Sequence, residues 1–155
     1  MADRKKDYAV VLGCALLTFL SAAAIIGLSG QDSGQSHALS KGLTAWILSF
    51  LPLENTPENL EFLNFILRKL AHFGLYFLLG VGLTGLVQGR WKAPTVLIVI
   101  LLGGLFAASD EFHQRFSQGR SPSGWDVLLD TCGVAAGWGV FQGQKWLKKR
   151  WDGRR

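Results

Sequence analysis

Long apolar runs separated by short polar segments dominate the chain and predict its helices. An uncharged run over residues 8–28 follows a short charged lead, and further apolar runs cover residues 70–88, 93–110 and 125–144. A helix of roughly 20 apolar residues crosses the hydrocarbon core of a bilayer, which is about 30 Å thick. Each run therefore predicts one transmembrane helix. The first run exceeds the apolar region of a signal peptide, so it predicts a retained helix.

Apolar positions recur at helical spacing between the first two runs, at Leu39, Leu43, Trp46, Ile47 and Phe50. Polar residues separate them, which predicts an amphipathic helix lying in the outer membrane interface with its tryptophan at headgroup level. A helix packed against a protein core is the alternative, and it leaves the topology unchanged. Downstream, the Thr56-Pro57 pair is typical of an N-cap followed by proline at the first helical position.

Composition supports an all-α, polytopic membrane protein made of a single domain, residues 1–155. Hydrophobic residues make up 49% of the chain and charged residues 17%, with a mean hydropathy of +0.25, whereas soluble domains have about 25% charged residues. The net charge of +5 does not indicate a nucleic-acid partner, because the basic residues stand at the ends of apolar runs rather than on one amphipathic element.

The basic residues also predict the orientation of the helices. If the N-terminus is inside, eleven Lys and Arg residues face the cytoplasm and five face outward. Cytoplasmic loops carry the excess of Lys and Arg, so both termini are expected in the cytoplasm.

Polar side chains on three of the predicted spans fall at one depth, near the outer face. Helical spacing places each set on one face of its helix, and burying these faces against one another costs less than exposing them to lipid. The sets are Lys69, His72 and Tyr76; Asp110, Glu111 and Gln114; and Asp126 and Asp130, followed on the same face by Gly133 and Gly137. The two glycines form a small-xxx-small pair that favours close helix packing.

Four short motifs carry a family resemblance. They are Lys69-x-x-His72-Phe73-x-x-Tyr76, Asp110-Glu111-x-x-Gln114-x-Phe116-x-x-x-Arg120-Ser121, Asp126, and Gly133-x-x-x-Gly137. Together they resemble the VanZ-like family of small bacterial membrane proteins. The resemblance implies a location in the bacterial plasma membrane and a role in the cell envelope, since the best-known member of that family is associated with resistance to the glycopeptide teicoplanin. Two positions depart from the pattern: Asp130 stands where asparagine is expected, and the loop before Arg120 lacks a proline.

The polar residues divide by the chemistry they suit. Arg120 is the best candidate for contacting an anion, because a guanidinium fork matches phosphate or carboxylate, and its structural alternative is an ion pair with Asp126 or Glu111. Lysines at helix ends are commonly interfacial anchors, which is the alternative for Lys69. The candidate ligand-binding residues are Lys69, Tyr76, Gln114, Arg120 and Ser121, and the candidate catalytic residues are His72, Asp110, Glu111, Asp126 and Asp130.

Two functions remain open on this reading. The first is binding of an amphiphile at the outer leaflet, such as a lipid headgroup, a lipid-linked cell-wall precursor or a lipoglycopeptide. The alternative is a membrane hydrolase or transferase acting on a lipid-linked envelope substrate, with His72 or Glu111 as general base. An ion pathway is less favoured, because the inner halves of the spans lack ionisable residues. No cofactor is expected. The carboxylates and His72 could hold a metal, but no compact ligand motif such as H-E-x-x-H is present, so no metal is expected either.

Overall fold

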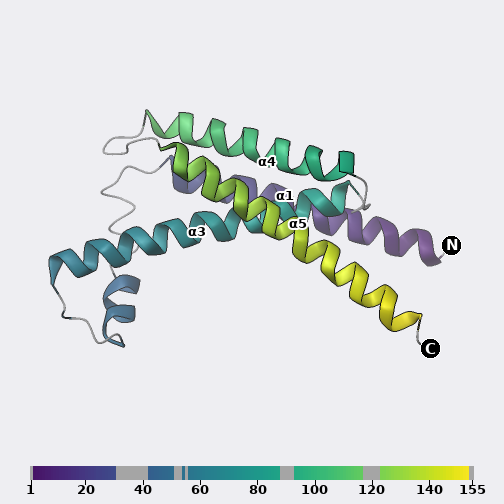
Figure 1. Ribbon diagram of the computed structural model, residues 1–155, viewed down its shortest axis with the longest axis horizontal. Helices are drawn as coiled ribbons and strands as arrows, with labels where there is room; N and C mark the ends of the chain where they lie inside the picture. The colour runs from purple at the N-terminus through teal and green to yellow at the C-terminus, as the bar shows by residue number, and fades with distance from the viewer. Residues whose placement is uncertain are drawn as a thin grey trace.

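The chain folds into long helices, in agreement with the predicted all-α class (Figure 1). The structure, a computed structural model, describes residues 2–30, 42–50, 54, 56–87, 93–116 and 123–153. A short helix covers residues 42–48. The long helices are α1 (Ala2–Ser29), α3 (Pro57–Leu86), α4 (Ala93–Gln114) and α5 (Gly124–Asp152).

Two of the long helices begin at polar caps. The Thr56 side chain accepts a hydrogen bond from the Asn59 backbone N–H at 3.3 Å, and Pro57 follows it at the first helical position, which confirms the predicted start of α3. Ser123 caps α5 in the same way through the Trp125 backbone N–H, also at 3.3 Å. These side chains satisfy backbone donors that have no partner within the helix.

The helices are longer than the apolar runs that predicted them. The charged lead is already helical from Ala2, α4 continues to Gln114, and α5 continues to Asp152. Hydropathy marks the part of a helix suited to lipid, whereas helical hydrogen bonding continues through polar turns beyond it. The predicted bounds at residues 8, 110 and 144 are those of membrane spans, so they do not coincide with the helix ends, and the candidate span Tyr8–Ser29 agrees with the first of them.

Three segments of the described chain are long and apolar enough to cross a membrane. They are Tyr8–Ser29, Pro57–Leu86 and Thr95–Gln114. Helix α5 is not among them, because several glycines, Gln142, Gln144 and Asp130 dilute its apolar character. The membrane character of the chain is thus supported, while a fourth span remains a prediction.

Glycines bring α3 and α5 into close backbone contact. A Cβ atom added at Gly137 would collide with the Phe77 carbonyl oxygen, and one at Gly133 would lie 2.8 Å from the Phe73 carbonyl oxygen. Across the same interface, a Cβ at Gly80 would meet the backbone of Val134. The predicted small-xxx-small pair is therefore a helix contact, and it packs on α3. Further along, Gly82 and Gly85 of α3 lie against α1.

Helix α3 is the centre of the bundle. It packs mainly against α1 and α5, and α4 packs mainly against α5. Figure 1 shows both ends of the chain at the same end of the bundle, with the short helix of residues 42–48 below the first turns of α3. In that short helix Thr44 and Leu48 are buried, whereas Leu43 and Trp46 are exposed, as is Phe50 in the turn that follows.

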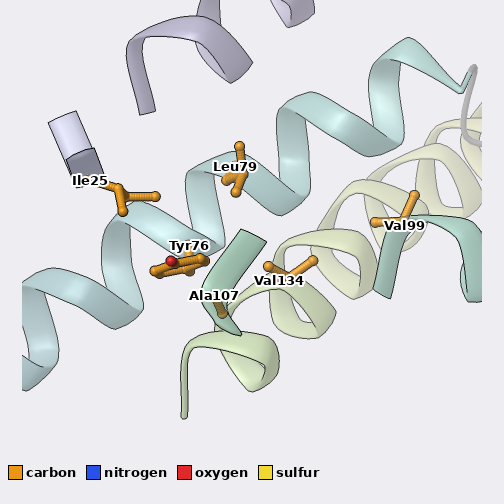
Figure 2. Close-up of a cluster of buried hydrophobic side chains, with 6 residues drawn as sticks. All are labelled: Ile25, Tyr76, Leu79, Val99, Ala107 and Val134. Carbon is orange, nitrogen blue, oxygen red and sulfur yellow. The ribbon is translucent and has the colours of Figure 1, made fainter. Parts of the chain in front are cut away.

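The interior is small, and it contains a larger share of polar side chains than the interior of a soluble domain does. All four long helices contribute to the apolar cluster, which contains Ile25, Tyr76, Leu79, Val99, Ala107 and Val134 (Figure 2). More polar than apolar side chains are buried among the described residues. Large apolar side chains are instead exposed, for example Phe19 at 69% and Leu97 at 68%. A soluble protein rarely exposes such continuous apolar surface, whereas lipid covers it without penalty.

Candidate functional site

The predicted polar residues meet where α1 and α4 end and α5 begins, beside the middle of α3 (Figure 1). The described side chains come from three helices as predicted, and Ser29 at the end of α1 adds a fourth element. The glycine contact explains part of this arrangement. Gly133 lies against Phe73, so the α5 face that carries Asp130 is brought opposite the α3 face that carries His72.

Asp110 accepts two side-chain hydrogen bonds. Its Oδ2 accepts a hydrogen bond from the Ser29 hydroxyl at 2.9 Å and another from the Gln114 side-chain amide at 3.2 Å. All three side chains are buried. Burying a carboxylate is costly unless donors surround it, so these contacts stabilise the site and join α1 to α4.

Glu111 joins α4 to the beginning of α5. Its Oε1 accepts a hydrogen bond from the Ser123 backbone N–H at 2.5 Å, and the Ser123 hydroxyl caps α5. A carboxylate at a helix N-terminus also interacts favourably with the helix dipole. Glu111 is therefore held in one orientation, with one oxygen engaged by the neighbouring helix.

Two pairs of a basic and an acidic side chain face each other between α3 and α5. Lys69 forms a salt bridge with Asp126, and its ammonium group lies 5.2 Å from the centre of the Phe65 ring. One turn deeper, His72 Nδ1 lies 3.8 Å from Asp130 Oδ2. That distance is too long for a hydrogen bond. The alternative pairing of Arg120 with Asp126 or Glu111 lies outside the described residues, and the Lys69–Asp126 pair was not predicted.

Tyr76 is completely buried, and its ring packs against Phe106 with the ring centres 6.1 Å apart. Its hydroxyl lies near the carboxylates of Asp110 and Asp130 but makes no hydrogen bond with a described residue. Tyr76 thus belongs both to the apolar cluster of Figure 2 and to the inner edge of the polar site.

A small polar cavity and a larger apolar groove lie side by side. The cavity measures about 30 Å³, enough for one or two waters, and the groove measures about 350 Å³. Phe65, Lys69 and Leu129 line both spaces. The cavity is completed by Arg68, His72, Glu111, Gln114, Asp126 and Asp130, and the groove by Ile66, Leu70 and Phe73.

The structure brings together every predicted site residue that it describes. Arg120 and Ser121 lie outside the described residues, so their predicted ligand contacts stay predictions. Sequence reasoning missed Ser29, Arg68 and Leu129. Arg68 could have been predicted, because it is adjacent to Lys69 in the sequence. Ser29 could not, because no local sequence pattern connects it with Asp110, 81 positions away.

These helices and their enclosed polar cluster define a helical membrane protein with a polar site among its apolar segments. The chain belongs to the VanZ/LLP1 family, whose family model matches residues 8–147. This match extends well beyond the stretch from Lys69 to Gly137 that carried the resemblance. No curated protein and no solved structure matches the chain.

Proposed function

We propose that this protein binds an amphiphilic molecule with an anionic headgroup at the outer leaflet of the bacterial plasma membrane. The observation that carries the proposal is the shared wall between the polar cavity and the apolar groove, formed by Phe65, Lys69 and Leu129. A headgroup at the mouth of the cavity, with one anionic oxygen inside it, would leave its chain in the groove. Pockets that combine an apolar lining with a few polar groups are typical of such ligand sites.

Arg68 supplies the positive charge for this headgroup. It is half-buried, it lines the cavity, and it forms no ion pair with the described residues. Lys69 is already paired with Asp126, so its charge is partly compensated. A guanidinium group presents several donors in a fixed fork that suits phosphate or carboxylate. Arg120 is proposed as a second contact on the basis of its position in the sequence motif.

The site faces outward in the topology that we propose. In that topology α1, α3, α4 and α5 all span the membrane, both termini lie in the cytoplasm, and the helix of residues 42–48 rests at the outer interface. Support comes from the distribution of Lys and Arg and from the location of both chain ends at the same end of the bundle (Figure 1). The exposed Trp46 and Phe50 suit an interfacial position.

Arg68→Ala tests the binding site. The purified full-length protein in uncharged detergent is titrated with phosphatidylglycerol, and bound lipid is measured by native mass spectrometry. A hydrogen bond to a charged group contributes about 1.5–3 kcal/mol, so the variant is expected to raise the Kd about tenfold or more. Arg115→Ala is the matched control, because Arg115 is exposed and lies outside the cavity.

Equal lipid binding by wild type, Arg68→Ala and Arg115→Ala would contradict the proposed site. If the protein converts a lipid-linked envelope substrate into a product of different mass, the hydrolase or transferase alternative replaces simple binding. A resistance role has its own test: Glu111→Gln and Arg120→Ala should abolish glycopeptide resistance at unchanged membrane levels.

A further inference from the structure

Three ionisable side chains from three different helices lie close together at the polar cavity, and two of them line it. They are His72 of α3, Asp110 of α4 and Asp130 of α5, and the potential ligand atoms of all three lie within 4.8 Å of one another. Both aspartates are buried, and His72 is partly buried. These residues are 20 or more positions apart in the chain, so only the packing of the helices assembles them.

Among the described residues, carboxylates outnumber the cationic side chains around this cluster. Four carboxyl groups, those of Asp110, Glu111, Asp126 and Asp130, face two permanently charged side chains, Arg68 and Lys69. Lys69 is paired with Asp126, at the outer side of the cluster. No lysine or arginine among the described residues pairs with Asp110 or Asp130. Two adjacent buried carboxylates in a low-dielectric setting favour a cation between them.

The details of the contacts match a metal site better than a direct ion pair. The 3.8 Å gap between His72 Nδ1 and Asp130 Oδ2 is too long for a hydrogen bond. Zn–N and Zn–O bonds of about 2.0–2.2 Å place two ligand atoms of one ion roughly 3.3–3.6 Å apart, close to this gap. A ligand atom of Asp110 lies within 4.8 Å of both of the others.

Two further observations support this interpretation, the second of them independently of the carboxylate groups. Asp110 is oriented by hydrogen bonds from Ser29 and Gln114, as carboxylates that bind metals commonly are. The Tyr76 hydroxyl is completely buried beside the two aspartates and has no hydrogen-bond partner among the described residues. A bound ion, or a water bound to it, would give this oxygen a partner.

We propose that His72, Asp110 and Asp130 bind one divalent transition-metal ion of the zinc class. The imidazole nitrogen favours such an ion over magnesium or calcium, which prefer oxygen ligands. Two aspartates and a neutral imidazole balance its charge of +2, which reduces the cost of burying the ion among membrane helices. Three protein ligands leave a fourth position for water or for a group entering from the cavity, since His72 and Asp130 also line the cavity. The sequence alone predicted no metal, because these ligands form no compact motif.

Zinc binding to the full-length protein in detergent tests the proposal. After treatment with a chelator and reloading with Zn²⁺, we expect about one zinc per chain by elemental mass spectrometry. Calorimetry should show that His72→Ala and Asp130→Asn each raise the Kd at least tenfold. The matched controls are His113→Ala and Asp152→Asn, because both side chains are exposed and neither is among the clustered ligand residues. These controls should retain wild-type stoichiometry and affinity.

Unchanged zinc affinity in both site variants would overturn the proposal, as would an equal loss of affinity in the controls. Cobalt substitution of the wild-type protein provides a test that does not depend on the folding of variants. Co²⁺ held by one nitrogen and two carboxylates with an open position should give intense visible absorption bands. A spectrum matching that of hydrated Co²⁺, together with no retained zinc, would exclude the site.

Discussion

At the scale of single residues, the protein places several carboxylates within helices that are otherwise apolar. Asp110 has two hydrogen-bond donors, Glu111 accepts from a backbone N–H, and Asp126 is paired with Lys69. Each of these three acids thus has a polar partner on another segment or one helical turn away. Because an uncompensated buried charge is costly, these contacts determine how the helix ends meet.

Ser29→Ala measures the contribution of one such contact. The variant removes the hydroxyl that donates to Asp110 across the α1–α4 interface. A hydrogen bond to a charged group typically contributes about 1.5–3 kcal/mol, so we expect the free energy of unfolding in detergent to fall by about that amount. Ser109→Ala is the control, since Ser109 precedes Asp110 but is exposed. An equal effect of the two substitutions would show that the Ser29 contact contributes nothing specific.

At the scale of helices, the close approach of α3 and α5 sets the geometry of the site. Gly133 and Gly137 let the backbone of α5 contact that of α3 near Phe73 and Phe77. Small residues allow such contacts inside membranes, where dispersion forces and polar contacts, rather than burial from water, hold helices together. The same contact aligns His72 with Asp130, so packing and candidate chemistry depend on the same few residues.

Gly137→Ala is expected to destabilise the bundle by about 1–3 kcal/mol, the usual cost of overpacking. The added Cβ would meet the Phe77 carbonyl oxygen and the Val81 backbone nitrogen, which cannot move without shifting α3. Gly139→Ala is the matched control, because a Cβ there meets nothing within 4 Å. Thermal unfolding of the two variants in the same detergent provides the comparison. If both melt like the wild type, the glycine contact does not determine the packing of these helices.

At the scale of the whole molecule, apolar side chains face outward and polar side chains gather inside. The apolar cluster is small and is shared by α1, α3, α4 and α5 (Figure 2). Exposed residues such as Leu101 and Leu105 continue the apolar surface along α4. This apolar surface is therefore expected to be covered by lipid rather than by a larger protein core. Whether α5 also crosses the membrane decides on which side the chain ends.

Reporter fusions distinguish three spans from four. With four spans, green fluorescent protein fused after Arg155 should fluoresce, because the C-terminus lies in the cytoplasm, and alkaline phosphatase at the same position should be inactive. Alkaline phosphatase fused after Glu54 should be active, since that position is expected outside. The positive-inside bias of the chain is the physical basis of this prediction. An active phosphatase fusion after Arg155 would instead show that α5 does not cross.

The sequence by itself determined the helical class, the apolar segments, the Thr56 cap and the set of polar residues that share a face on each helix. These features depend on local periodicity, on capping chemistry and on segment length, all of which are readable along the chain. The helices continue beyond the predicted spans, because hydropathy reports suitability for lipid rather than hydrogen bonding of the backbone.

Only the tertiary structure decided which polar groups touch one another. The Ser29–Asp110 hydrogen bond, the Lys69–Asp126 pair and the convergence of His72 with two aspartates join residues that are far apart in the chain. The same is true of the wall shared by the polar cavity and the apolar groove. A periodic pattern identifies the face of a helix but not its partner, and the rotation and depth of each helix are set by backbone contacts such as those at Gly133 and Gly137.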